Sequence, residues 1–257
     1  MNKLSASEKQ RTLLIGFLAG VLAGLFGVGG GFLMVPLYLA WLHIDQKKAH
    51  ATSLGAVVPI AIAGAIGYTA TGDVNWTSAL YLLAGSFFGA IYGAKLLHTI
   101  SLPRLQLVFS GLLTVSAIRL LWSAQPTQIV DGLAGHLLLI AVGFFAGTMS
   151  GLLGIGGGII MVPAMIIAAG LDAVTARGTS LAVIVGSGIS GTYAHYKRGN
   201  ILFPIAILSG LAGVPAVYLG IYLSQNLPER ISVAIFAAVL LTIAYQQFKK
   251  SVKTQYS

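Results

Sequence analysis

Two clusters of glycine carry the most distinctive chemistry in this sequence. Residues 27–31 read GVGGG, and residues 154–158, which lie 127 positions later, read GIGGG. Consecutive glycines are poor helix formers and permit positive φ, so each cluster predicts a turn. Backbone N–H groups at a turn that leads into a helix form an electropositive hollow suited to anions. We expect an anion site here, with a purely structural hinge as the alternative. The candidate glycines are Gly29, Gly30, Gly31, Gly156, Gly157 and Gly158.

Polar side chains follow each cluster at matching positions and could complete such a site. Hydroxyls can donate to an oxyanion, although in membrane helices they equally serve as N-caps or interhelical hydrogen bonds. A histidine or arginine three positions before the serine could steer an anion, with contact to the membrane interface as the alternative. These candidates are His50, Thr52, Ser53, Arg177, Thr179 and Ser180. A proline five residues beyond each glycine run predicts a kink, and the expected hinge residues are Gly27, Pro36, Gly154 and Pro163.

What the sequence lacks restricts the chemistry further. The absence of Cys excludes disulfides, a thiolate nucleophile and a cysteine-ligated metal. All six Asp and Glu fall in predicted tails or loops, so no carboxylate is expected at mid-membrane depth as a proton relay or Na⁺ ligand. The five His lack metal-ligand spacing, and no Ser–His–Asp triad is evident. We expect no catalytic residue, metal or cofactor, and an enzyme is the least favoured class.

Composition defines the kind of protein that must position these residues. Of 257 residues, 56% are hydrophobic and 8% are charged, whereas soluble domains are about 25% charged. So few charges cannot cover a soluble domain of this length, which indicates an integral membrane protein with the lipid bilayer as a partner. The net charge of +9 comes from scattered Lys and Arg, so a nucleic-acid partner is not expected.

The chain also repeats itself. Residues 16–37 and 143–164 share their glycines and a proline at a constant offset of 127. We therefore assign one transmembrane domain, residues 1–257, with internal repeats at about 12–122 and 132–248. Internal duplication in an apolar chain is typical of secondary transporters.

The repeats predict an all-α membrane fold. Each repeat opens with an element that its glycine cluster divides into two short half-helices, either re-entrant or extended into full tilted spans. Three ordinary spans of about 20 residues follow, each long enough to cross the hydrocarbon. The expected spans are 50–71, 76–96, 103–122, 177–197, 201–223 and 229–248.

The distribution of Lys and Arg favours the re-entrant arrangement. If the opening element returns to its starting side, twelve of the 15 cations share the N-terminal side and only Arg119, Arg177 and Arg230 lie opposite. A single crossing gives a weaker division of nine to six. Cations concentrate in cytoplasmic loops, so both termini are expected in the cytoplasm of a multi-pass plasma (bacterial inner) membrane protein. A hairpin plus three spans crosses an odd number of times, which makes the second repeat inverted.

These motifs carry a family resemblance. The doubled GxxxGxxGxGGGxxxxP block, the downstream A-x-x-T-S-L and the G-D-V-N-W after the second span resemble the sulfite exporter TauE/SafE family of membrane transporters. The resemblance covers nearly the whole chain. It implies an inner-membrane carrier for sulfite, sulfoacetate or related organosulfonates. His50-Ala51-Thr52 departs from the family pattern more than Arg177-Gly178-Thr179 does.

The hypothesis is therefore a secondary transporter with one central anion site between the two glycine turns, working by alternating access. Export of an anion from a negative cytoplasm is downhill by about 2.3 kcal/mol per charge per 100 mV, so it needs no coupling carboxylate. The alternatives are a transporter or channel for another small anion, such as thiosulfate, sulfate or a small carboxylate, and a membrane subunit that acts only in assembly. The transported anion, the direction of transport and assembly into a homo-oligomer stay open.

Overall fold

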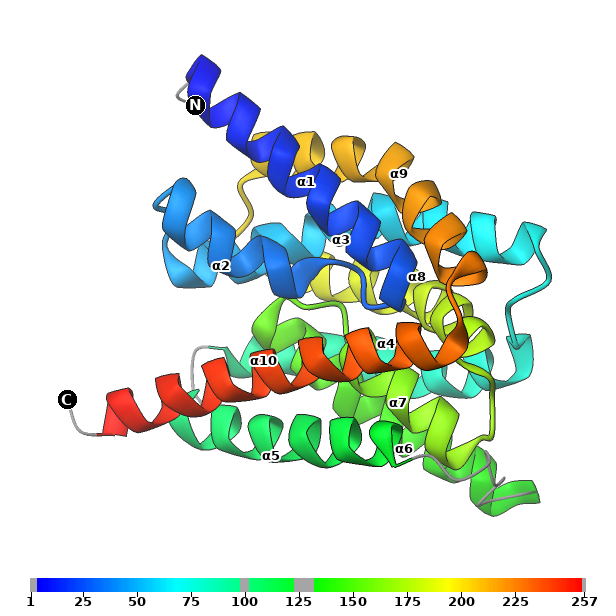
Figure 1. Ribbon diagram of the computed structural model, residues 1–257. Helices are drawn as coiled ribbons and strands as arrows, with labels where there is room; N and C mark the ends of the chain where they lie inside the picture. Colours follow the sequence, from blue (N-terminus) through cyan, green and yellow to red (C-terminus); the bar gives the residue numbers. More distant parts are fainter. Residues whose placement is uncertain (1–3, 98–101, 123–131, 256–257) are drawn as a thin grey trace.

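The computed structural model describes residues 4–97, 102–122 and 132–255, which fold into ten α-helices with no β-strand among them (Figure 1). The first half contains α1 (Ala6–Phe26), α2 (Gly31–Trp41), α3 (Gln46–Ala70), α4 (Trp76–Leu96) and α5 (Leu102–Leu121). The second half contains α6 (Gly132–Leu153), α7 (Gly158–Ala168), α8 (Ala173–Tyr196), α9 (Phe203–Asn226) and α10 (Glu229–Gln255). Each helix of the second half begins 126 or 127 positions after its counterpart, so the sequence repeat is also a repeat of helices.

Six helices in the described part of the chain are long and apolar enough to cross a membrane. They are α1, α3, α4, α6, α9 and the Glu229–Gln246 part of α10. This confirms an all-helical, multi-spanning protein, although the set differs from the expected spans. Helices α1 and α6, expected as short half-helices, run for 21 and 22 residues. The reason in α1 is that Ser5 and Glu8 form a capping box, which starts the helix before the apolar run.

One expected span, α8, falls outside this set. The expected span 103–122, which corresponds to α5, includes side chains that lie outside the described residues. Helix α8 carries Arg177 and several Thr, Ser and Gly residues, yet most of its length is buried. A helix enclosed by other helices does not need the apolar surface that contact with lipid requires.

The glycines at four-residue intervals bring helices of opposite halves into main-chain contact. A Cβ on Gly20 of α1 would overlap the carbonyl oxygen of Gly213 in α9. At the equivalent place, a Cβ on Gly147 of α6 would overlap the carbonyl oxygen of Ser86 in α4. Small residues allow this close approach of helix backbones. The pairing is reciprocal, because the first helix of each half packs against the fourth helix of the other.

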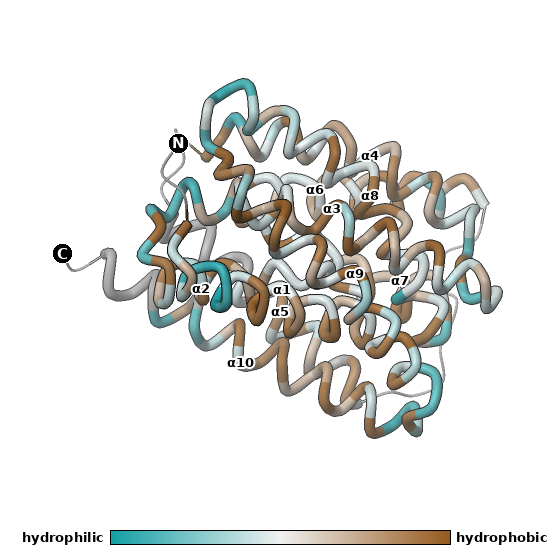
Figure 2. Tube along the Cα trace, turned by 90° about the horizontal axis from the view of Figure 1, so that it is seen from above, coloured by the Kyte–Doolittle hydropathy of each residue, from teal (hydrophilic) through white to brown (hydrophobic). Residues whose placement is uncertain are grey.

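The remaining contacts follow the same rule. Helix α3 packs against its counterpart α8, and α5 packs against its counterpart α10. Buried apolar side chains gather in two groups, one around α1, α2, α3 and α9 and the other around α4, α5, α6, α7 and α10. Hydrophilic stretches lie mainly at the two ends of the molecule (Figure 2).

Each opening element is a hairpin. In the first half, Arg11 Nη1 donates to the carbonyl oxygen of Trp41 over 2.8 Å, so the end of α2 lies back beside the start of α1. In the second half, the start of α6 and the end of α7 line one cavity. The α1–α2 hairpin opens toward the end of the molecule where both termini lie, and the α6–α7 hairpin opens toward the other end (Figure 1). The tips of both hairpins therefore reach the middle.

Candidate functional site

The two hairpin tips are left-handed glycine turns. Gly27, Gly29 and Gly30 have φ of 69°, 77° and 74°. The equivalent glycines of the second turn, at positions 154, 156 and 157, have φ of 66°, 82° and 80°. An L-residue in this conformation is strained by roughly 1–2 kcal/mol. Because three such residues occur in each turn, the glycine-rich sequence is what lets the chain reverse between α1 and α2 and between α6 and α7.

The turns lie against each other. A Cβ on Gly31 would overlap the carbonyl oxygen of Gly154, and a Cβ on Gly158 would overlap the carbonyl oxygen of Gly27. We call this contact region, residues 27–31 with residues 154–158, the glycine junction. It is completely enclosed, since every residue in it is buried.

Two predicted serines fasten the junction from the neighbouring helices. Ser53 Oγ of α3 donates to the carbonyl oxygen of Gly154 over 2.9 Å. Ser180 Oγ of α8 donates to the carbonyl oxygen of Gly27 over 2.8 Å. Each serine therefore binds the turn of the opposite half. Both hydroxyls are fully buried, and in this conformation their protons are directed at the turns.

Most backbone N–H groups of the junction, unlike the two carbonyls that the serines bind, lack a hydrogen-bond partner among the described residues. Within the described part of the chain, no acceptor is paired with the amides of residues 29–31 or 156–158. Helices α2 and α7 begin here, and neither Gly30 nor Gly157 provides a side-chain cap. Two helix N-termini thus meet with uncapped amides in a buried place, which is a strongly electropositive arrangement.

The two predicted threonines hold the chain segments that lead into α4 and α9. Thr179 Oγ1 accepts from the backbone N–H of Asn75 over 2.9 Å. Thr52 Oγ1 accepts from the backbone N–H of Leu202 over 3.0 Å. Both threonines are fully buried and occupy repeat-equivalent positions. They connect the junction helices α3 and α8 to the other half of the molecule.

The backbones of Arg177 and His50 pack directly against the two glycine turns. A Cβ on Gly27 would meet the backbone of Arg177, and a Cβ on Gly154 would overlap the carbonyl oxygen of His50. Their side chains then diverge. The imidazole Nδ1 of His50 lies 2.6 Å from the carbonyl oxygen of Leu153.

The guanidinium of Arg177 is the least compensated polar group near the junction. The residue is 1% exposed, and its Nη1 donates to Ser224 Oγ over 2.9 Å. Its Nε and Nη2 have no hydrogen-bond partner among the described residues. A buried cation of this kind is costly unless an anion accompanies it.

The predicted hinge residues occupy the ends and middles of the hairpin limbs. Gly27 caps the C-terminus of α1, and Gly154 follows the last residue of α6. Pro36 and Pro163 lie inside α2 and α7, where each leaves one carbonyl without its helical partner. A helix can bend at such positions, and the role of these four residues as hinges stays a prediction.

Sequence reasoning missed several residues that the fold brings to the site. Val57 and Ile184, which are repeat-equivalent, contact the positions where a Cβ would stand on Gly29 and Gly156. An apolar residue in an apolar span carries no distinguishing signal. Ser224, the partner of Arg177, could not be found from the repeat because the equivalent residue in the first half is Leu97. In the described ranges, no cluster of three His, Asp or Glu could hold a metal ion.

The chain is similar in sequence to a known family of membrane proteins. The profile of the family described as "Sulfite exporter TauE/SafE" matches residues 2–120 and 139–256. The "Probable membrane transporter protein YdhB" of Bacillus subtilis is 25% identical over 237 residues, covering 90% of this chain and 96% of that protein. A "Probable membrane transporter protein" of Xylella fastidiosa is 29% identical over 250 residues, covering 92% and 95%. One from Haemophilus influenzae is also 29% identical, covering 93% and 97%. No solved structure matches the chain.

Proposed function

Because the chain belongs to the TauE/SafE family of membrane transporters, we propose that it carries sulfite or a related sulfur oxyanion or organosulfonate across the plasma membrane. The anion binds at the glycine junction, and transport proceeds by alternating access. The observation that carries this proposal is the set of six junction amides, at residues 29–31 and 156–158, that have no acceptor in the described chain.

The physical reason is the cost of leaving such groups unsatisfied. Each buried amide without a partner loses free energy comparable to a lost hydrogen bond, and in a bilayer no water repays it. An oxyanion has enough lone pairs to accept from several amides at once, and its charge is favoured by the N-termini of α2 and α7. The buried guanidinium of Arg177, whose Nε and Nη2 have no hydrogen-bond partner among the described residues, adds positive potential on one side of the junction.

In this proposal the two halves are inverted repeats with re-entrant hairpins, and both termini face the cytoplasm of a bacterial inner membrane. The reciprocal contacts of α1 with α9 and of α6 with α4 support a two-fold relation between the halves. The hairpins open toward opposite ends, as inverted repeats require (Figure 1). The division of Lys and Arg supports the orientation.

Alternating access follows from the serine bonds. Ser53 and Ser180 each tie the turn of one half to a helix of the other. Breaking one bond lets the hairpin on that side withdraw and exposes the anion to that side, while the other bond keeps the opposite side closed. With both bonds formed, as in this structure, the site is occluded.

The first test uses Val57, because replacing the turn glycines themselves would strain the backbone. Val57→Asp places a carboxylate beside the junction amides, where it competes with the anion. Val57→Asn has the same shape without the charge and is the matched control. We expect sulfite counterflow in proteoliposomes to be lost in Val57→Asp and kept in Val57→Asn. Equal counterflow in both folded variants contradicts the proposed site, and flux that never saturates with sulfite favours a channel.

The second test concerns orientation. The chain has no Cys, so single cysteines can be introduced without background labelling. Lys47→Cys and Asn226→Cys occupy exposed positions at opposite ends of α3 and α9. A membrane-impermeant maleimide added to intact cells should label Asn226→Cys alone. Labelling of Lys47→Cys instead reverses the assigned orientation.

A further inference from the structure

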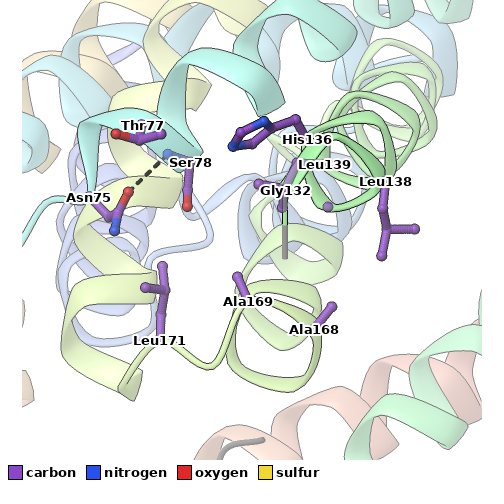
Figure 3. Close-up of a pocket in the computed structure, with 11 residues that line it drawn as sticks. Asn75, Thr77, Ser78, Gly132, His136, Leu138, Leu139, Ala168, Ala169 and Leu171 are labelled. Carbon is purple, nitrogen blue, oxygen red and sulfur yellow. Dashed lines mark hydrogen bonds between the residues drawn. The ribbon is translucent and has the colours of Figure 1, made fainter. Parts of the chain in front are cut away.

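A cavity of about 210 Å³ lies outside the glycine junction, at the end of the molecule toward which the α6–α7 hairpin opens (Figure 3). The start of α4, the start of α6 and the end of α7 enclose it. We call it the end pocket. It is distinct from the junction because none of the junction residues lines it.

One wall of the end pocket presents hydrogen-bond donors. Asn75 caps α4, and its side-chain oxygen accepts from the backbone N–H of Ser78 over 2.9 Å, which leaves its amino group for the pocket. Ser78 is 7% exposed, and its hydroxyl, which has no partner among the described residues, points into the cavity (Figure 3). The imidazole of His136 stacks on Tyr81 with 4.1 Å between ring centroids, and this stacking fixes the orientation of its ring.

The other wall is apolar and uncharged. It consists of Leu138, Leu139, Ala168, Ala169 and Leu171. No Asp, Glu, Lys or Arg is among the residues that line the pocket in the described part of the chain. A ligand that satisfies both walls has an oxygen-rich head that accepts from the donors and a short apolar group that covers the leucines and alanines. A bare inorganic oxyanion would leave the second wall uncovered.

The equivalent region of the first half lacks the donors of the end pocket, and a hydrogen bond bridges its hairpin limbs. The donors Asn75 and Ser78 correspond to Leu202 and Ile205, which cannot bind an anion. The gap between the hairpin limbs is bridged by the hydrogen bond from Arg11 to Trp41, where the second half has Leu138 and Ala168. The polar, open version therefore occurs in the second half and not at the matching place, which argues against a pocket left by chance.

The end pocket also connects directly to the proposed transport site. Asn75 uses its side chain to line the pocket and its own backbone N–H to donate to Thr179 Oγ1 over 2.9 Å. Thr179 is followed by Ser180, which binds the first glycine turn. Asn75 and Thr179 therefore connect a ligand in the pocket to Ser180, the serine that binds the first glycine turn.

We propose that the end pocket is a second anion site that selects small organic oxyanions, such as a short-chain alkanesulfonate, on one side of the membrane. This inference rests on the proposed anion transport, and it narrows the substrate class toward organic anions. The site holds the anion at the end opposite the termini, next to the route between that end and the junction.

Equilibrium binding of ethanesulfonate to the full-length protein in lipid nanodiscs, measured by calorimetry, tests this site. Asn75→Asp keeps the oxygen that caps α4 but adds a negative charge at the head-group position, and we expect binding to weaken at least tenfold. Ala168→Trp introduces a bulky side chain that fills the pocket, as the residue type at the equivalent position, Trp41, suggests, and the same loss is expected. Ser78→Ala removes one donor to a charged group and should weaken binding about tenfold.

Asn226→Asp is the matched control, because it adds the same charge at an exposed place outside the pocket and should change affinity less than twofold. Wild-type affinity in both folded Asn75→Asp and Ala168→Trp overturns the proposal, as does a wild type that does not bind ethanesulfonate. Val57→Asp separates the two sites. Sulfite counterflow in that variant reports on the junction, whereas ethanesulfonate binding that survives Val57→Asp and is lost in Ala168→Trp belongs to the end pocket.

Discussion

The middle of this molecule and its two ends treat the internal repeat differently. At the glycine junction the contacts recur almost without change, as in the serine bonds of 2.9 Å to Gly154 and 2.8 Å to Gly27. At the ends the equivalent positions diverge, because the donors Asn75 and Ser78 at one end correspond to the apolar Leu202 and Ile205 at the other. Beside the junction, the repeat-equivalent side chains of Arg177 and His50 also differ.

Symmetry constrains the centre of a duplicated transporter more than its ends. A central site that must open to either side needs the same turn and the same clamp in both halves. An end is reached from one side only, so it can differ from its counterpart without disturbing the centre. We infer that the junction binds and occludes the anion, while the ends determine which anion arrives and from where.

The largest expected effect comes from the glycines that join α1 to α9 and α6 to α4. Gly20→Leu and Gly147→Leu would each force a side chain into the main chain of the partner helix. We expect neither variant to yield monodisperse protein in size-exclusion chromatography, since overlap with backbone cannot be relieved by a rotamer change. Gly111→Leu, at a position where a Cβ would have no heavy atom within 4 Å, should behave as wild type. Failure in one half alone would mean that the two interfaces are not equivalent.

The next effect should separate the two sides of the glycine junction. Arg177→Leu removes a buried cation whose Nε and Nη2 have no hydrogen-bond partner among the described residues, so the unfolding temperature without anion should not fall. Its affinity for sulfite should drop at least tenfold. His50→Leu removes one contact to the carbonyl oxygen of Leu153 and should change sulfite affinity less than threefold. Thermal unfolding with and without sulfite measures both, and an equal loss of affinity in the two variants would remove the asymmetry.

A smaller effect on stability, equal in the two halves, is expected when the serine hydrogen bonds to the glycine turns are removed. Ser53→Ala and Ser180→Ala each leave one buried carbonyl without its hydroxyl donor. The expected loss in the free energy of unfolding is about 1–2 kcal/mol for each. The two values, obtained from denaturant titration in detergent, should agree within about 0.5 kcal/mol. A loss confined to one serine would show that the junction is less symmetric than its geometry.

The smallest effect belongs to the closed end of the first half. Arg11 is exposed, and its hydrogen bond to the carbonyl oxygen of Trp41 competes with water. Arg11→Leu should therefore lower the free energy of unfolding by less than about 1 kcal/mol. The same titration measures this value. A loss in the free energy of unfolding above about 2 kcal/mol would mean that the fold requires this bond, and that the bond does more than bridge the gap between α1 and α2.

Much of the fold was predictable because local signals agreed with the repeat. Each glycine cluster predicts a turn that leads into a helix, and the helices α2 and α7 begin at its last residue, Gly31 and Gly158. Asp45 and Asp172, which are repeat-equivalent, cap α3 and α8, and each accepts two backbone N–H groups there. The length of α1 was not predicted, because its spaced glycines weaken a helix in isolation and are compensated only by the packing of α9.

The site itself was only partly predictable. The sequence identifies the glycines and hydroxyls, but it does not show that Ser53 and Ser180 donate to the turns of opposite halves. That pairing depends on how α3 and α8 cross, which is a property of the tertiary structure. The end pocket had one sequence signal, the contrast between Asn75 and Leu202 at equivalent positions, whose meaning depends on the placement of α4 beside α6 and α7.

We propose that the amides of the two glycine turns bind the transported oxyanion. Anomalous diffraction at the selenium edge from crystals soaked with selenite, a heavier analogue of sulfite, tests it most directly. A selenium peak is expected between the two turns, at a position from which the selenite oxygens can accept from the amides at residues 29–31 and 156–158. A peak found only beside Arg177 or in the end pocket, with none between the turns, would contradict it.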